Sequence, residues 1–586
     1  MGIVAGLIAA LVGLGVAELV AGMSASLQSP VLDVGDRVVD SVPNSIKELA
    51  IDWFGTNDKI ALLVGIAAIL AVYAAVLGVI AQTRRWPFAI VGIALFGVVG
   101  AYASQSTRRD VPWYGIVPSI VGAVAAGVVL WMLRVHRHDD EPANDDRSDD
   151  RRSFLLAAGG FGLLAVFTGS VGRWLNGRNS VSGQRNELGV PIARDPLPDA
   201  PDAVRIGVDG VEPFYTPNSD FYRIDTALTV PQVSVDGWTL RITGMVDEEI
   251  ELTYDELLQR EIVEADITLS CVSNEIGGNL LGNARWTGVR LDDLLAEAGI
   301  AADADQIVGR SVDGYTCGFP TAALDGRNAL VAVAMNGEPL PLEHGYPARL
   351  IVPGLYGYVS ATKWLEEIEL TRFDAFDQYW VERGWVEDAP IKTQSRIDTP
   401  RGLQTVQAGT VPIAGAAWAQ TRGIERVEIQ IDDGEWVEAR LADPLNDVTW
   451  RQWSYAWEAT PGRHDIRVRA TDGTGAIQTD ERTEPFPSGA TGRHQIVVMV
   501  ETTVNTSHTP RRSRSRLAIA TIAGLSLVAA ACGDDGDDDA TPATEAPSED
   551  SMAPETTMAP ETTMADDMDD MDDGDMEADT MGAFGP

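Results

Sequence analysis

The sequence predicts a multi-domain protein with an N-terminal five-helix transmembrane region, an α+β domain, a β-sandwich and a disordered acidic tail. Three observations predict it: five apolar stretches before residue 175, short-strand patterning over residues 201–500, and a low-complexity acidic final segment with Asp/Met runs. A chain of 586 residues is too long for a single core. Its formal charge of −42 argues against a nucleic-acid partner.

Residues 1–175 are expected to lie in a membrane. About 20 apolar residues span the hydrocarbon core of a bilayer. Runs of this kind occupy residues 2–23, 60–82, 86–103, 111–133 and 154–171. The segment 43–54 is expected to form a small amphipathic helix at the membrane surface.

Arginines in the short loops predict the orientation. The arginines in 83–85 and 134–152 outnumber Arg108 and Arg109, which favour the opposite orientation. The majority places the N-terminus in the cytoplasm and everything after the fifth span outside. The fifth span opens with Arg-Arg-Ser-Phe-Leu at 151–155, which resembles a twin-arginine export signal. Two ordinary positive-inside arginines are the alternative. We therefore expect a multi-pass protein of the cytoplasmic membrane with extracytoplasmic catalytic domains.

Beyond a linker at 176–200, residues 201–385 show the mixed pattern of an α+β domain, with strands at 238–244 and 362–370 and helices at 254–258 and 291–298. Residues 386–500 are expected to be all-β. Their strands lie at 411–418, 424–431, 436–441, 450–457, 464–470 and 495–500, a spacing typical of an Ig-like sandwich. No catalytic cluster falls in this region, so an interaction or dimerisation role is expected.

The chemistry concentrates around Cys271, which ends a strand and precedes a Gly/Asn-rich loop over 274–283. Such loops permit close approach to a ligand. Taken alone, the cysteine is either a core residue, a nucleophile or a metal ligand. The chain has no Cys-x-x-Cys pair, which disfavours zinc, and no general base for a cysteine hydrolase can be placed.

Four segments resemble the sulfite-oxidase family of molybdenum enzymes, in its membrane-anchored, actinobacterial type. They are the stretch 266–289 with Asn-Ala-Arg-Trp-x-Gly-Val-x-Leu after the cysteine, Thr-Pro-Asn-Ser-Asp-Phe-Tyr-Arg-Ile-Asp at 216–225, the run 335–354, and Ala-Thr-Lys-Trp at 361–364. The resemblance covers about residues 200–500, including the family's Ig-like dimerisation domain, and implies a homodimer.

The resemblance implies a molybdenum–molybdopterin cofactor with Cys271 as the thiolate ligand of the metal. Residues placed on its cofactor-binding positions are Tyr222, Arg223, Asp225, Cys271, Ser273, Asn274, Asp313, His344, Arg349, Ala361, Thr362 and Lys363. Catalytic candidates are Cys271, Tyr315, Arg285 and Arg223. Tyr315 either hydrogen-bonds oxygen at the metal or substrate, or packs within a sheet; Cys317 is expected to be a small core residue.

One departure concerns the substrate. Sulfite oxidases place an arginine shortly after the ligand cysteine, where this chain has Glu275 and Ile276. Either Arg285 or Arg223 supplies the cation, or the substrate is not sulfite.

The implied activity is two-electron oxygen-atom transfer to or from a small oxyanion or S/N-oxide substrate. No histidine falls within a span and no Cys-x-x-Cys-His motif is present, so no haem is expected and electrons pass to a separate carrier that is cytochrome c-like or quinone-linked. The alternatives are a sulfoxide or N-oxide reductase of the same superfamily and a non-catalytic binding protein on this scaffold.

The C-terminal segment has a different character. Residues 501–532 hold a basic stretch, a 15-residue apolar run over 517–531 and then Cys532, the plan of a lipoprotein signal. A tail anchor is the alternative. Residues 533–586 contain 19 acidic and no basic residues and are expected to be disordered. The segment is interpreted as a neighbouring lipoprotein gene fused to this frame, or as an error of sequence assembly.

Overall fold

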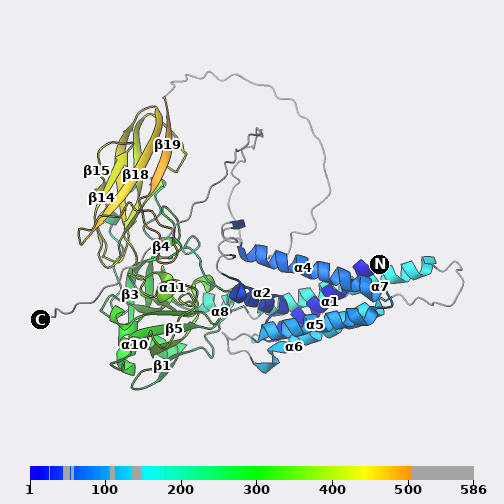
Figure 1. Cartoon of the computed structure of the whole chain (residues 1–586). Helices are drawn as coiled ribbons and strands as arrows, with labels where there is room; N and C mark the ends of the chain where they lie inside the picture. The colour runs from blue at the N-terminus through cyan, green and yellow to red at the C-terminus, as the bar shows by residue number, and fades with distance from the viewer. Residues whose placement is uncertain are drawn as a thin grey trace, which may run out of the picture. The chain divides into compact units, whose positions relative to one another are not determined.

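The computed structural model describes residues 1–24, 27–43, 46, 53–54, 58–105, 112–134, 147–178 and 180–502 (Figure 1). The lipoprotein-like segment after residue 502 and the acidic tail lie outside the described residues, as does most of the surface helix expected at 43–54.

The N-terminal region is helical, as the apolar runs predict. Its long helices are α1 (Gly2–Ala21), α4 (Asp58–Ala81), α5 (Trp86–Ser104), α6 (Val117–Met132, preceded by η2, Trp113–Ile116) and α7 (Arg147–Arg178). In the described part of the chain five helices are long and apolar enough to cross a membrane, judged by length and composition. The α7 helix begins before the predicted fifth span and ends after it.

The α1 helix packs against α4, α6 and α7. Glycine brings these backbones close together: a Cβ on Gly13 would lie 2.8 Å from the carbonyl oxygen of Gly122 in α6. Small residues at such crossings are how helices pack tightly in membranes.

The sequence analysis missed α2 (Pro30–Ser41), a helix of 12 residues. It begins with Pro30, whose missing N–H costs nothing at the first helical position. Its acidic residues interrupt every apolar run, so a search for long apolar stretches passes over it.

The α+β domain holds two sheets. One has the order β2-β1-β10-β5-β6; the other has the order β3-β4-β7-β8, with β9 also paired to β7. The strands are β1 (Thr239–Gly244), β2 (Ile250–Thr253), β3 (Ile262–Ser270), β4 (Leu281–Arg290), β5 (Gln306–Ser311), β6 (Thr316–Pro320), β7 (Leu330–Met335), β8 (Glu338–Pro339), β9 (Arg349–Ile351) and β10 (Leu365–Thr371).

Two short helices, α8 (Ser182–Glu187) and η3 (Asp202–Val204), precede the first strand, and others connect the strands: α9 (Tyr254–Leu258), α10 (Leu291–Ala298), η4 (Thr321–Ala323), η5 (Leu342–His344) and α11 (Gly357–Ser360). The predicted helices at 254–258 and 291–298 are confirmed. Thr253 and Glu256 form a capping box that fixes the start of α9.

The region after residue 390 consists of two further sheets, with the orders β11-β13-β17-β16 and β12-β19-β18-β14-β15. Their strands are β11 (Gln394–Thr399), β12 (Thr405–Gln407), β13 (Gly409–Trp418), β14 (Ile424–Ile431), β15 (Val437–Glu438), β16 (Arg440–Leu441), β17 (Arg451–Ala459), β18 (Gly462–Asp472) and β19 (Gln495–Glu501). Ile413 and Trp453 of the first sheet share a buried core with Val427 and Val468 of the second. Five of the six predicted strands are present as single strands, whereas the strand predicted at 436–441 is wrong, because this stretch divides into β15 and β16, which belong to different sheets. The strands β11 and β12 were not predicted.

Candidate active site

A cavity lies where the loops of both α+β sheets meet, with about 760 Å³ of space between protein atoms, part of it open to solvent. Nine of the residues nominated from the sequence line it: Tyr222, Asp225, Cys271, Asp313, Tyr315, His344, Arg349, Ala361 and Lys363. The lining also includes Phe221, Ser311, Tyr358, Trp364 and Trp380, which the sequence analysis did not single out. Segments distant in the chain therefore form one site.

Cys271 follows β3 directly, and its N–H donates to the carbonyl of Leu280 at 2.9 Å. The Asn274 side chain accepts from the Leu280 N–H at 2.8 Å, which closes the loop behind the cysteine. The thiol is free and 6 % exposed. Burial raises its pKa, while the N–H groups of Ser273 and Val272 and the Ser273 hydroxyl pull it down. The sulfur is therefore placed to become a thiolate once a cation binds.

Residues of the two-sheet region after residue 390 contact the loop that follows Cys271. Gly277 has φ +77°, and a Cβ there would lie 2.3 Å from the His494 ring. Arg396 donates from Nη1 to the Gly278 carbonyl at 3.0 Å and pairs through Nε with Asp398 at 2.6 Å. The sequence analysis missed His494 and Arg396 because their contacts cross between domains and leave no local signal.

Arg349, the first residue of β9, is a buried cation without a carboxylate partner among the described residues. Its side chain donates from Nη1 to the His344 carbonyl at 3.0 Å, and Nε has no hydrogen-bond partner in the described part of the chain. Burial lowers the pKa of Arg349 to about 10. Because a buried charge is costly unless paired, this guanidinium is prepared for an anion in the cavity.

His344 lies beside Arg349 and is uncharged at neutral pH. Burial, together with the positive charge of Arg349, lowers the pKa of His344 to about 4. Its Nε2 hydrogen-bonds the carbonyl of Asn218 at 3.1 Å, which assigns the proton to Nε2 and leaves Nδ1 as an acceptor. The Phe221 ring meets the imidazole edge-to-face at 5.6 Å. Burial raises the pKa of Tyr222, which stands near Cys271 and Arg349 and stays protonated.

A charged cluster forms another wall. Lys363 donates from Nζ to Asp225 at 2.7 Å and to the Glu343 carbonyl at 3.0 Å. Burial lowers the pKa of Lys363 to about 8, although Asp225 opposes that shift. Burial would raise the pKa of Asp225, but Lys363 and Arg223 outweigh it and hold that pKa well below its usual range. Gly345 permits this approach, since its φ is +110° and a Cβ would lie 3.0 Å from the Lys363 Cα.

Arg285, nominated as a substrate cation, lies on β4 and is fully engaged. It pairs with Asp266 through Nε at 2.9 Å and Nη2 at 3.0 Å. Nη1 donates to the Leu197 carbonyl at 3.0 Å, while Nη2 donates to the Pro198 carbonyl at 2.8 Å and to the Tyr215 hydroxyl at 3.2 Å. The Arg285 guanidinium therefore links the segment at Leu197 and Pro198 to strands β3 and β4.

The remaining nominated side chains divide between core and cavity. The Thr362 hydroxyl donates to the sulfur of Cys317 at 2.7 Å, and both are fully buried, as expected for Cys317. Tyr315 lines the cavity, but its hydroxyl already donates to the Tyr358 carbonyl at 2.7 Å. Burial raises the pKa of Tyr315 well above its usual value, so it stays protonated.

Comparison with known proteins shows which class of enzyme the chain resembles. Residues 227–380 match the family model described as "Oxidoreductase molybdopterin binding domain". The chain is 28% identical over 319 residues to mitochondrial sulfite oxidase of Homo sapiens, covering 46% of this chain and 58% of that one. It is 32% identical over 148 residues to the uncharacterized oxidoreductase YuiH of Bacillus subtilis, covering 25% of this chain and 72% of YuiH.

The sulfane dehydrogenase SoxCD of Paracoccus pantotrophus aligns over 54% of this chain and 94% of its own at 22% identity, with a TM-score of 0.43, too low to support a conclusion. The matching family model and the two relatives show that the protein is a molybdopterin-dependent oxidoreductase. More narrowly, the chain belongs to the sulfite-oxidase family. It spans just over half the length of human sulfite oxidase.

The family implies a molybdenum cofactor, and the residues present fit one. Cys271 offers a soft sulfur donor at the cavity wall. Arg349 offers an unpaired buried cation for the phosphate of a pterin, and a guanidinium suits phosphate geometry.

Proposed function

We propose that this protein is a membrane-anchored molybdenum oxidoreductase that catalyses two-electron oxygen-atom transfer, as sulfite oxidases do. The observation that carries the proposal is the presence of the Cys271 thiol and the unpaired Arg349 guanidinium in the wall of one cavity. When bound, the molybdenum cofactor supplies the two-electron redox chemistry and the oxygen transfer. Electrons then pass to a separate carrier, cytochrome c-like or quinone-linked.

The chain's own residues bind and orient the cofactor. Cys271 ligates the metal, with the N–H groups and hydroxyl around its sulfur favouring the thiolate. Arg349 and Lys363 hold the phosphate, and neutral His344 offers Nδ1 as an acceptor. Tyr222, Asp225, Asp313 and Ala361 complete the wall, while Ser273 and Asn274 support the cysteine loop and Thr362 fixes the backbone next to Lys363.

Substrate is proposed to enter beside Tyr315. Of the two arginines nominated for anion binding, Arg223 is the better candidate, because Arg223 and Lys363 share the single carboxylate of Asp225, so this group of residues at the cavity wall keeps a net positive charge. Arg285 has its donors occupied elsewhere.

A second candidate activity is the reduction of a sulfoxide or N-oxide. Glu275 and Ile276 stand where sulfite oxidases carry an arginine, and aromatic side chains of Tyr315, Tyr358 and Trp380 line the cavity. Such walls suit an uncharged organosulfur group.

The rest of the chain serves this site in the proposal. The five apolar helices anchor the protein in the cytoplasmic membrane, the Arg-Arg segment exports the folded domain, and the two-sheet region is an Ig-like domain that forms a homodimer. The domain limits are those expected from the sequence, at 201–385 and 386–500.

Metal analysis of the purified full chain tests the proposal. Wild type from a host that makes molybdopterin should contain molybdenum, and Cys271→Ser should lose it. Cys317→Ser is the matched control, since Cys317 is also buried but does not line the cavity and accepts a hydrogen bond from Thr362, and it should keep the metal. Wild type without molybdenum would leave only the non-catalytic binding role.

Turnover separates the two activities. Sulfite with an artificial electron acceptor should be oxidised if the first holds. An enzyme that contains molybdenum, leaves sulfite unchanged and reduces a sulfoxide with a chemical electron donor would establish the second.

A further inference from the structure

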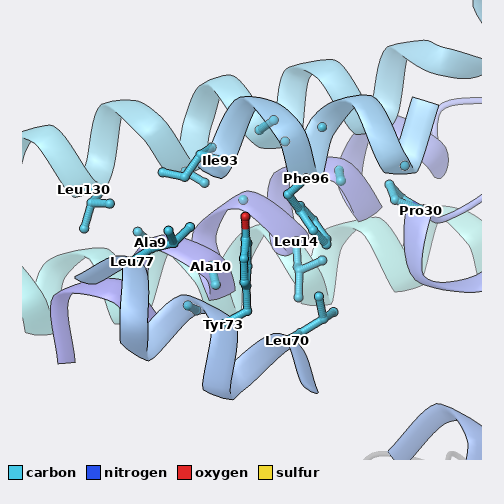
Figure 2. Close-up of a pocket in the computed structure, with 18 of the residues that line it drawn as sticks. Ala9, Ala10, Leu14, Pro30, Leu70, Tyr73, Leu77, Ile93, Phe96 and Leu130 are labelled. Atoms are coloured by element: carbon cyan, nitrogen blue, oxygen red, sulfur yellow. The ribbon is translucent and has the colours of Figure 1, made fainter. Parts of the chain in front are cut away.

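A second cavity lies inside the helical bundle, with about 700 Å³ of space unfilled by protein atoms, part of it open at the surface. Figure 2 shows Tyr73 of α4 and Phe96 of α5 projecting into it from different helices. Much of the remaining wall is small: Gly6, Ala9, Ala10, Gly13, Ala17, Ala74, Gly97, Gly100, Gly122, Ala123 and Ala126. Glycines at the helix crossings, such as Gly13 against Gly122, let the backbones approach closely, so the space that remains between the helices is a narrow apolar slot.

The slot contains one unsatisfied polar group. Ser119, near the start of α6, lines the cavity and is 5 % exposed, yet its hydroxyl has no hydrogen-bond partner among the described residues. A Cβ on Gly100 would lie 2.7 Å from this hydroxyl, so the glycine allows α5 to pack close to Ser119. The Tyr73 hydroxyl, by contrast, already donates to the Gly92 carbonyl at 3.0 Å. A buried hydroxyl without a partner is costly, which points to a ligand that accepts from Ser119.

The unsatisfied hydroxyl lies toward one end of the bundle. Gly122 of α6 is in contact range of Ala17, near the C-terminus of α1. Farther along α1, Gly22 faces Gly172, near the end of α7. Ser119, one turn before Gly122, is therefore at the end where α7 leads into the catalytic part of the chain.

We propose that this cavity binds an isoprenoid quinone. Its ring carbonyl accepts from Ser119, its ring packs against Phe96 and Tyr73, and its hydrocarbon tail follows the glycine and alanine wall. The role assigned to the quinone rests on the proposed function: one substrate and one water yield the oxygenated product, two electrons and two protons, which together convert a quinone into its quinol. An ester lipid also has a carbonyl and a tail, but it has no ring for the aromatic walls.

Quinone binding is measured on the full chain in detergent, by native mass spectrometry and by equilibrium dialysis of a ubiquinone or menaquinone with two isoprene units. Wild type should bind one quinone. Ser119→Ala should bind it about three- to tenfold more weakly, the range expected for one neutral hydrogen bond. The control is Thr168→Ala in α7, whose hydroxyl donates to the Leu164 carbonyl at 2.9 Å; it should bind as wild type does.

Two ligands separate a ring-carbonyl site from a lipid slot. An isoprenoid hydrocarbon without the ring should bind weakly and equally to wild type and Ser119→Ala. Phosphatidylglycerol in excess should not displace the quinone. Equal quinone binding by wild type and Ser119→Ala, or full displacement by the phospholipid, would overturn the proposal. Protein from a host unable to make molybdopterin should bind the quinone equally well. Loss of quinone binding and loss of the molybdenum-dependent activity are therefore distinguishable.

Discussion

Replacing Arg349 with methionine should change the stability of the cofactor-free and the cofactor-loaded protein in opposite directions. A pKa of about 10 in place of 12.5 means that holding this guanidinium charged in the folded state costs about 3 kcal/mol. The cost is present in full at pH 7, because the residue is protonated in both states there, and it is relieved only as pH rises through 10. The variant loses one hydrogen bond to the His344 carbonyl, worth about 1 kcal/mol.

The variant also loses the cation–π contact of Arg349 with the Trp286 ring, 5.1 Å from the ring centre and worth about 1 kcal/mol. The free energy of unfolding of the cofactor-free protein should therefore rise by about 1 kcal/mol in Arg349→Met. Tryptophan fluorescence during heating reports this as a higher transition temperature. In the loaded protein the variant should bind molybdopterin about 10- to 150-fold more weakly, since a charge-assisted bond to phosphate contributes about 1.5–3 kcal/mol. Arg194→Met is the control, an exposed arginine paired with Glu261 that should change neither quantity. A destabilised cofactor-free variant, or wild-type retention of the pterin, would refute the reasoning.

Other perturbations test the same site. Asp225→Asn should lower the pKa of Lys363 below about 8, so that molybdopterin retention, measured by pterin fluorescence, declines at lower pH than in wild type as Lys363 loses its charge. The pKa of His344 is about 4 in the folded protein and about 6.5 in the unfolded chain, so the unfolded chain is protonated first and the folded state loses stability as pH falls from 6.5 to 4. In His344→Gln the unfolding transition temperature should depend less on pH in that range. Gly345→Ala should cost about 2 kcal/mol or more, measured by thermal unfolding, and exceed the cost of Gly326→Ala, which has a positive φ but open space around it. An equal loss of unfolding free energy in Gly345→Ala and Gly326→Ala would show that contact with Lys363 does not contribute.

Much of the fold could be read from the sequence where one physical requirement dominates. Apolar length alone identified the long helices, and the strands of the sandwich follow from alternation between turn residues. The helix at Pro30 escaped because it is short and rich in acidic residues, so it has no apolar run to detect. The strand β11 begins inside a polar stretch and gains its place by pairing with β13, a contact that no local pattern encodes.

Two of the three nominated arginines, Arg285 and Arg349, show why the site was only partly predictable. Arg285 and Arg349 both stand in segments that resemble the family, and a motif records the residue type but not whether its charge is already used. Register decides the first case: β3 and β4 place Asp266 opposite Arg285, so a carboxylate meets the guanidinium within the sheet. Burial decides the second, because Arg349 is enclosed at the start of β9 without an acidic partner in the described structure. An arginine with its carboxylate across the strand holds the fold together, whereas one buried without a carboxylate retains an interaction for a ligand.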